Sequence, residues 1–238
     1  LEQLILDRKY SRNQGKGVQT HCSKFEEDFA QKMGTKHSLL VTSGTNALVC
    51  ALIAVGVTQG DEVIIPSYTF FASAAAVINV GATPVIANID QTLMINPNEV
   101  SKLISKKTKA IIAVHMDGHP CQMDTLTQLA KANNLFLIED VAQAVGGTFK
   151  KQRLGSIGDV GCFSFNVDKI ISAGEGGAIA TNSRPYFERS LCVQDASAMF
   201  GATHKEAFQN IEPFIGQSMR VSEITGALMS VQLSRLDY

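Results

Sequence analysis

The chain alternates short apolar runs with segments of helical spacing over its first 140 residues. The apolar runs are uninterrupted, which is typical of strands that are buried on both faces of a sheet. They fall at residues 38–41, 62–65, 84–87, 110–114 and 135–138. Apolar residues three and four apart predict helices at 46–55, 70–80 and 123–132. This order predicts an α/β fold, a three-layer sandwich with a mainly parallel central sheet.

The start of the chain departs from this pattern. Residues 1–22 are mostly polar and aperiodic, so we expect an extended or loop N-terminal lead-in segment there. Ser23 and Glu26 have the spacing of a capping box, in which each side chain accepts a first-turn N–H group. A first helix is therefore expected at 24–33, closed by Gly34.

After residue 154 the alternation of long helices and apolar strands gives way to a different sequence pattern. After residue 154, glycine-rich turns surround two predicted short strands at 161–165 and 178–181. From Ser222 onward, apolar positions at helical spacing predict a helix that still runs where the chain stops.

Composition narrows the classes of protein. The 238 residues are 45% hydrophobic and carry a net charge of −1 without a basic run, which argues against nucleic-acid binding. The longest apolar stretch, around 70–80, is too short for the roughly 20 residues of a membrane span. Five cysteines without a C-x-x-C pair favour reduced thiols in a cytoplasm, and predict neither disulfides nor a zinc site.

Candidate chemistry lies where predicted strands end, because ligands in open α/β sheets bind beyond the carboxyl ends of the strands. Gly44 and Thr45 stand in the run Thr-Ser-Gly-Thr-Asn at the start of a predicted helix, whose N–H groups suit a phosphate. The run is equally suited to a plain N-cap, since it matches neither common nucleotide motif. Phe70 follows the strand at 62–65 and could stack on a flat ring, although such residues more commonly belong to a core.

Two further segments carry charged candidates. Asp140 comes directly after the apolar run at 135–138, where a carboxylate is costly unless a partner meets it. It suits a protonated pyridine nitrogen, a metal ion or a structural arginine. Lys169 stands between a Phe-rich strand and a glycine-rich turn, with Ser164 and Asn166 nearby. Such an amine can attack an aldehyde to form a Schiff base, whereas most lysines simply lie at the surface.

These segments resemble a known family. In order, the chain contains SGTNAL, PSYTFF, GATPV, VHMDGHP, IEDVAQAVGG, LGSIGDVGCFSFNVDK and AGEGGAIATN. The same order occurs in the DegT-type (DegT/DnrJ/StrS) sugar aminotransferases, which are fold-type-I enzymes dependent on pyridoxal 5′-phosphate (PLP). The resemblance covers about residues 24–236, and its most specific string is F-S-F-x-x-x-K-x-I-x-x-G-E-G-G.

The resemblance implies roles around the cofactor ring. Lys169 matches the residue that holds PLP covalently and moves the proton during the reaction. Asp140 matches the partner of the ring nitrogen, whose protonation makes the ring an electron sink. Gln143 matches the residue that contacts the ring oxygen, and Phe70 matches the aromatic that stacks on the ring.

The resemblance also implies a phosphate site. Gly44, Thr45 and Ser164 match phosphate-binding positions, and Asn166 is a pocket neighbour. Ser218 stands where the family usually carries an asparagine that reaches the phosphate of the neighbouring subunit's cofactor. Because serine is shorter but still donates one hydrogen bond, this cross-subunit contact is the point at which the chain departs from the family.

The implied activity is that of an aminotransferase in polysaccharide biosynthesis, which moves an amino group from L-glutamate to a keto-sugar nucleotide by a ping-pong mechanism. The presence of Lys169 favours this over a PLP-dependent sugar dehydratase, because those relatives carry histidine at this position. A non-catalytic PLP-binding regulatory homologue is the other alternative. His115 and His119 either line the substrate side or, as we prefer, are satisfied loop histidines.

The resemblance further implies an aspartate aminotransferase-like large domain that works as a homodimer with active sites at the interface. Residues 23–238 correspond to this PLP-binding large domain. The family's small C-terminal domain is expected to follow it, so we expect the chain to be a large-domain fragment.

Overall fold

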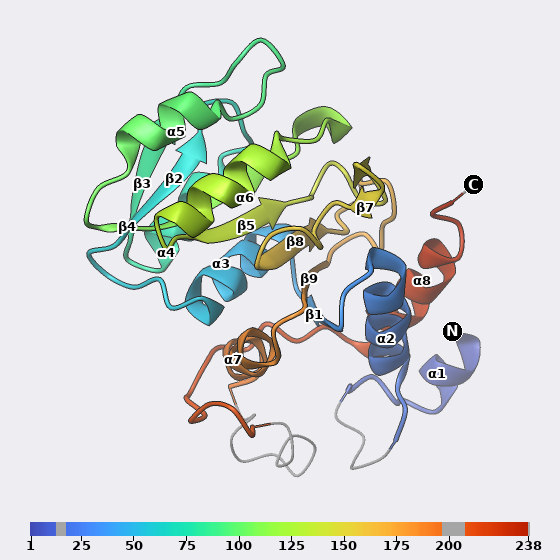
Figure 1. Cartoon of the computed structure of the whole chain (residues 1–238). Helices are drawn as coiled ribbons and strands as arrows, with labels where there is room; N and C mark the ends of the chain where they lie inside the picture. The colour runs from blue at the N-terminus through green and yellow to red at the C-terminus, as the bar shows by residue number, and fades with distance from the viewer. Residues whose placement is uncertain (13–17, 197–207, 238) are drawn as a thin grey trace.

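A mainly parallel sheet forms the centre of the molecule (Figure 1). The computed structural model describes residues 1–12, 18–196 and 208–237. Across the described part the strand order is β1-β9-β8-β5-β4-β2-β3. The strands are β1 (His37–Val41), β2 (Glu62–Pro66), β3 (Thr83–Ala87), β4 (Thr108–Val114), β5 (Phe136–Asp140), β8 (Val160–Ser164) and β9 (Gly177–Thr181). Only β9 runs against its neighbours, so the predicted parallel character is confirmed.

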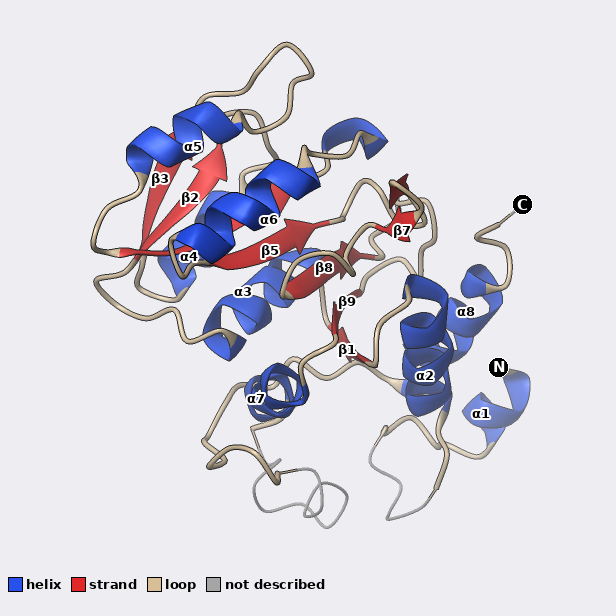
Figure 2. Ribbon diagram, viewed as in Figure 1, coloured by secondary structure: helices blue, strands red, loops and turns tan. Residues whose placement is uncertain are grey.

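Helices cover both faces of this sheet (Figure 2). One face carries α3 (Gly44–Ala54), α4 (Ala72–Asn79) and α7 (Arg184–Gln194). The other carries α5 (Pro97–Leu103), α6 (Met123–Ala132), α2 (His21–Met33) and α8 (Glu223–Leu233). The remaining elements are α1 (Glu2–Leu6), a 3₁₀ turn at Met116–Gly118 and a small hairpin of β6 (Thr148–Phe149) and β7 (Gln152–Arg153). The three-layer sandwich is therefore confirmed.

The uninterrupted apolar runs follow from this layering. Successive side chains of a strand point to opposite faces, and in β4 both faces are core. Ile112 and Val114 pack in the core under α3 and α4, whereas Ile111 and Ala113 pack in the core under α5 and α6. Residues 110–114 of the strand are therefore all buried and all apolar, whereas the polar residues Thr108 and Lys109 stand at its beginning. Among the described residues, none of the helices has the length and apolar character needed to cross a membrane.

The beginning of the chain differs from the prediction in two ways. Residues 2–6 form a helix rather than an extended segment. Helix α2 begins at His21, and its capping box pairs Thr20 with Ser23, so the predicted box of Ser23 with Glu26 is wrong. Glu26 instead accepts the Leu40 N–H at 2.7 Å and a hydrogen bond from Arg12 at 2.9 Å. Since β1 is an edge strand, this carboxylate satisfies an N–H group at the open edge.

The chain also holds two helices that periodicity did not predict. Helices α5 and α7 are short, but each begins with a capping side chain, Asn96 or Ser183, followed by a proline in the first turn. That cap-and-proline combination was the available signal. Helix α8 ends at Leu233, so the predicted continuation to the end of the chain is wrong for residues 234–237, which form turns.

Candidate active site

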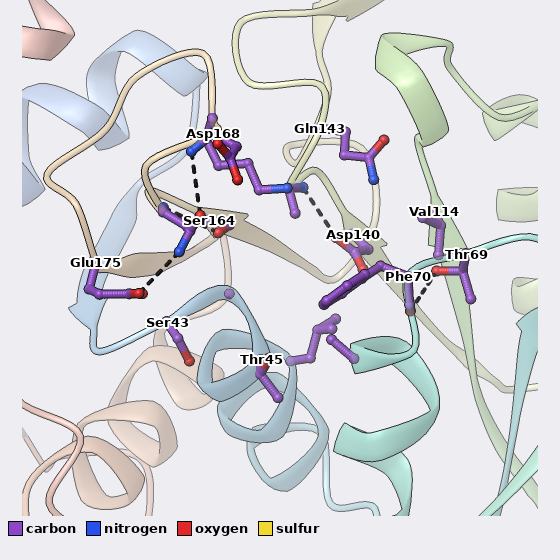
Figure 3. A pocket seen from close by; sticks show the side chains of 16 residues that line it. Ser43, Thr45, Thr69, Phe70, Val114, Asp140, Gln143, Ser164, Asp168 and Glu175 are labelled. Atoms are coloured by element: carbon purple, nitrogen blue, oxygen red, sulfur yellow. Dashed lines mark hydrogen bonds between the residues drawn. The ribbon is translucent and has the colours of Figure 1, made fainter.

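A cavity of about 310 Å³ opens at the carboxyl edge of the sheet (Figure 3). The loops that follow β1, β2, β5 and β8 and the end of β4 contribute to its wall, in agreement with the expectation for an open α/β sheet. Eight of the nine predicted site residues line it: Gly44, Thr45, Phe70, Asp140, Gln143, Ser164, Asn166 and Lys169. The ninth, Ser218, lies exposed on another segment, where its backbone bridges to Asp195.

The N-terminus of α3 forms one end of the cavity. Ser43 caps this helix by accepting the Asn46 N–H at 3.1 Å. The first-turn N–H groups of Gly44 and Thr45 have no acceptor within the helix, and the helix dipole favours an anion there. A Cβ atom on Gly44 would lie 2.7 Å from the Cβ of Ser164, so only glycine allows the helix start to approach β8 this closely. The result is a cradle of N–H groups and hydroxyls.

Asp140 ends β5, and its carboxylate is buried at the side of the cavity. One carboxylate oxygen accepts the Ala142 N–H at 3.1 Å, and the other accepts the Ser73 hydroxyl at 3.2 Å. Burial raises the pKa of the Asp140 carboxyl, while these two hydrogen bonds and the nearby positive charge of Lys169 act against the rise. Within the described residues, none of the ion pairs joins Asp140 to an arginine. A cationic group in the cavity would therefore relieve the cost of its burial.

Lys169 reaches the same cavity from the loop after β8. Its backbone N–H bonds to the Asn166 carbonyl at 3.0 Å, which closes a tight turn. The Asn166 amide in turn donates to Glu175 at 3.1 Å and ties this turn to the glycine-rich segment that leads to β9. Half-buried at the cavity wall, Lys169 is not the ordinary exposed lysine of the alternative interpretation.

Phe70 and Phe71 precede α4, which begins at Ala72 and not at Phe70 as predicted. The two rings are 56% and 72% exposed, so the alternative interpretation of these residues as core is wrong. Phe70 lies at the cavity (Figure 3), where its ring face is available to a planar ligand.

Gln143 is oriented by a residue that sequence reasoning missed. Its side-chain oxygen accepts the backbone N–H of Asp117 at 2.9 Å. Figure 3 shows the amide nitrogen on the side of the cavity, so Gln143 presents a donor to a ligand. The Asp-Gly pair at 117–118, a common turn signal, was the available hint of an unusual backbone there.

The two histidines after β4 do not line the cavity. His115 is fully buried, and its Nδ1 accepts the Cys121 N–H at 3.1 Å. Nε2 therefore carries the proton and donates to Glu139 at 3.1 Å. This confirms the preferred interpretation of His115 as a satisfied loop histidine, whereas His119 is exposed after the 3₁₀ turn.

The donor set fits pyridoxal phosphate. The fit rests on an amine for the aldehyde, a buried carboxylate for the ring nitrogen, an exposed aromatic ring for stacking, and an N–H cradle for the phosphate. All four line one cavity, although their residues are spread over 126 positions of the chain, from Gly44 to Lys169. Among the described residues, groups of three or more metal-ligating side chains were not found.

Comparison with known proteins agrees with this geometry. The model of the DegT/DnrJ/EryC1/StrS aminotransferase family matches residues 7–238. A GDP-perosamine synthase of Escherichia coli O157:H7 is 37% identical over 233 residues, which are 98% of this chain and 61% of the relative. An L-glutamine:2-deoxy-scyllo-inosose aminotransferase of Streptoalloteichus tenebrarius is 36% identical over 230 residues, or 93% of this chain and 54% of the relative.

Solved structures share the same fold. The aminotransferase from Psychrobacter cryohalolentis superposes with a TM-score of 0.88 at 35% identity, covering 98% of this chain and 60% of that one. NtdA from Bacillus subtilis, solved with the bound cofactor PMP, has a TM-score of 0.85 at 26% identity, covering 99% of this chain and 51% of that one. The chain thus spans between half and two thirds of the length of these relatives.

Proposed function

The chain belongs to the DegT/DnrJ/EryC1/StrS aminotransferase family, and on that premise we propose that it is the PLP-binding large domain of a sugar aminotransferase. The observation that carries the proposal is that the Lys169 amine and the buried Asp140 carboxylate line one cavity. An amine alone or a carboxylate alone would be compatible with many sites. Together with the cradle at Gly44, they match three different groups of a single cofactor.

PLP, when bound, supplies an electron sink that stabilises negative charge on the carbon beside the transferred nitrogen. The residues of the chain then have distinct tasks. Lys169 holds the cofactor covalently and, when released, moves a proton to and from the reacting carbon. Asp140 holds a proton at the ring nitrogen, Phe70 covers the ring face, and Gln143 donates to the ring oxygen. Gly44, Thr45 and Ser164 would bind the phosphate at the N-terminus of α3.

The proposed reaction moves an amino group from L-glutamate to the keto group of a nucleotide-linked sugar in polysaccharide biosynthesis. Both half-reactions use one cavity, so the kinetics should be ping-pong. L-glutamine is the second candidate donor, because the relative from S. tenebrarius is named for it. A sugar dehydratase is disfavoured by Lys169, and a non-catalytic regulatory protein would bind PLP without turnover.

We further propose that the protein works in the cytoplasm as a homodimer. The buried, unpaired cysteines agree with a reducing compartment. Val167 and Ile170, on the loop that carries Lys169, are 68% and 60% exposed, and their apolar side chains suit an interface beside the cavity. In such a dimer Ser218 would donate to the phosphate in the neighbouring subunit, although it lies outside the cavity of its own chain. Sedimentation of the wild type tests the homodimer. The PLP affinity of a Ser218→Ala variant, compared with that of the wild type, tests the contact of Ser218 with the phosphate.

The absorbance of bound cofactor tests the central proposal. Adding PLP to the purified protein should produce a visible band, and Lys169→Ala should abolish it. Lys151→Ala is the matched control, because Lys151 is an exposed lysine outside the cavity. An unchanged band in Lys169→Ala would refute the role of this lysine. Formation of 2-oxoglutarate from L-glutamate then separates an enzyme from a binding protein without turnover. Appearance of the glutamate nitrogen in the sugar product separates the aminotransferase from a dehydratase.

A further inference from the structure

Two hydroxyl groups form a chain behind the Asp140 carboxylate. The Ser73 hydroxyl, on α4, lies 3.2 Å from one carboxylate oxygen of Asp140. The Thr69 hydroxyl lies 2.8 Å from that of Ser73 and 3.2 Å from the carbonyl oxygen of Phe70. Ser73 is fully buried, whereas Thr69 lines the cavity. The chain thus runs from the buried carboxyl back to the cavity wall.

The proton count of this chain allows two complete arrangements. A hydroxyl has one proton to donate and lone pairs with which to accept. When Asp140 is ionised, Thr69 donates to Ser73 and Ser73 donates to the carboxylate. When Asp140 is protonated, its O–H donates to Ser73, Ser73 donates to Thr69, and Thr69 donates to the Phe70 carbonyl. The observed distances serve both arrangements, so neither protonation state leaves a hydroxyl without a partner.

We propose that Ser73 and Thr69 form a reversible hydrogen-bond chain that sets how firmly Asp140 holds the proton it shares with the ring nitrogen of the cofactor. Ser73 is then a positioning residue, since it acts through Asp140 and does not line the cavity. That the ring nitrogen of PLP shares this proton rests on the proposed function. The hydroxyl chain and its effect on the Asp140 carboxyl are present in the protein without cofactor.

Other groups around Asp140 come from different elements. Lys169 approaches from the loop after β8, and its positive charge favours the ionised carboxylate. His115 follows β4, and its Nδ1 is occupied as an acceptor of the Cys121 N–H. The Cys162 thiol on β8 is buried beside it, and burial raises the pKa of that thiol well above its usual range, so it stays neutral. Glu139 precedes Asp140 in β5 and points to the opposite face. The Ser73 hydroxyl is the contribution of α4, and removing it leaves all of these groups in place.

The titration of Asp140 in the cofactor-free protein tests the proposal. Carbon-13 NMR of carboxyl-labelled aspartate follows it, with the Asp140 resonance assigned as the one lost in Asp140→Asn. We expect Ser73→Ala to move the titration midpoint upward by at least about half a pH unit, because a hydrogen bond to a charged group is the stronger of the two that are lost. Thr69→Val should move it by less in the same direction, and the matched Thr69→Ser should leave it unchanged.

Infrared difference spectra of the protonated carboxyl provide a second readout. In Ser73→Ala the C=O stretch of protonated Asp140 should rise in frequency, since its O–H loses an acceptor. An unchanged titration midpoint of Asp140, or an unchanged frequency of its C=O stretch, in Ser73→Ala would refute the proposed hydrogen-bond chain. These results do not depend on PLP, so a protein that fails to form the Lys169-dependent band would refute the proposed function and leave the test of the chain intact.

Discussion

The side-chain oxygen of Gln143 accepts a hydrogen bond from the backbone N–H of Asp117 at 2.9 Å. Asp117 has a φ of 52°, in the left-handed region that is uncommon for residues other than glycine. This backbone conformation directs an N–H group at the loop after β5. The contact occupies the acceptor of the Gln143 amide and leaves its two donor hydrogens for the cavity.

Substitutions at these two positions test the orientation of the amide. Gln143→Glu keeps an oxygen for the Asp117 N–H but replaces the donor group with a second acceptor. We expect PLP to bind about tenfold more weakly, which corresponds to about 1.4 kcal/mol. Asp117→Gly keeps the N–H and adopts a positive φ without strain, so PLP affinity should stay within about twofold of the wild type. Equal PLP affinity of Gln143→Glu and wild type in a spectroscopic titration would contradict the donor role.

Asp140 should make the stability of the cofactor-free protein depend on pH. Burial raises the pKa of this carboxyl above its ordinary value of 3.8, so between 3.8 and the raised value the native state binds a proton that the unfolded state lacks. Stability due to this group is therefore full below pH 3.8 and is lost as the pH rises through the native pKa. Asp140→Asn cannot ionise, and its free energy of unfolding relative to wild type should increase across that window. Urea denaturation from pH 3.5 upward measures it, and a difference that is constant with pH would refute the statement.

Asp140→Asn should lower the transaminase activity, although it raises the stability of the cofactor-free protein. Asparagine keeps an oxygen for the Ala142 N–H but offers no negative charge to a protonated ring nitrogen. We expect Asp140→Asn to retain some PLP while losing most of its transamination, about a hundredfold or more if the charge contributes several kcal/mol. Single-turnover amination of PLP by L-glutamate measures this. Full activity of the variant would refute the role of Asp140 at the ring.

Helix α3 approaches β8 so closely at Gly44 that a side chain at this position should destabilise the protein. A Cβ on Gly44 would meet the Ser164 Cβ at 2.7 Å, so Gly44→Ala should lower the free energy of unfolding by about 1–3 kcal/mol and weaken PLP binding. Adding Ser164→Gly removes the clash and should recover part of the lost stability, which makes the two effects non-additive. Urea denaturation of the two single variants and the double variant forms the test. Strict additivity would show that the two residues do not clash.

The buried Glu139 should contribute more to the free energy of unfolding than the surface residue Glu99. Its two oxygens accept four hydrogen bonds, from His115 and from three backbone N–H groups of the turn at 155–158. Glu139→Gln turns one oxygen into an NH₂ group that faces donors, so we expect a loss of roughly 3 kcal/mol in the free energy of unfolding. Glu99→Gln is the control, because Glu99 forms an ion pair at the surface and should cost less than about 1 kcal/mol. Similar losses in both variants would contradict this role of Glu139.

The sequence predicted the central layer of the fold well because its signals are local. An uninterrupted apolar run needs only its own residues to indicate a strand with two buried faces, and β4 and β5 were located within two residues of their observed ends. The types of residue at the end of β5 and after β8 likewise identified Asp140 and Lys169 as candidates. Elements with weak periodicity, such as α5 and α7, were missed because packing against the sheet stabilises them more than their own pattern.

Pairings between distant segments were decided by the tertiary structure alone. The Gln143 side chain meets a residue 26 positions away, and Ser73 meets Asp140 across 67 positions. Glu26 has the spacing of a helix cap, yet it bonds Leu40 at the edge of the sheet. Local spacing shows which groups need a hydrogen-bond partner, since a buried polar atom without one is costly. Which partner it meets depends on the order of strands in the sheet, and that order brings the residues together only after folding.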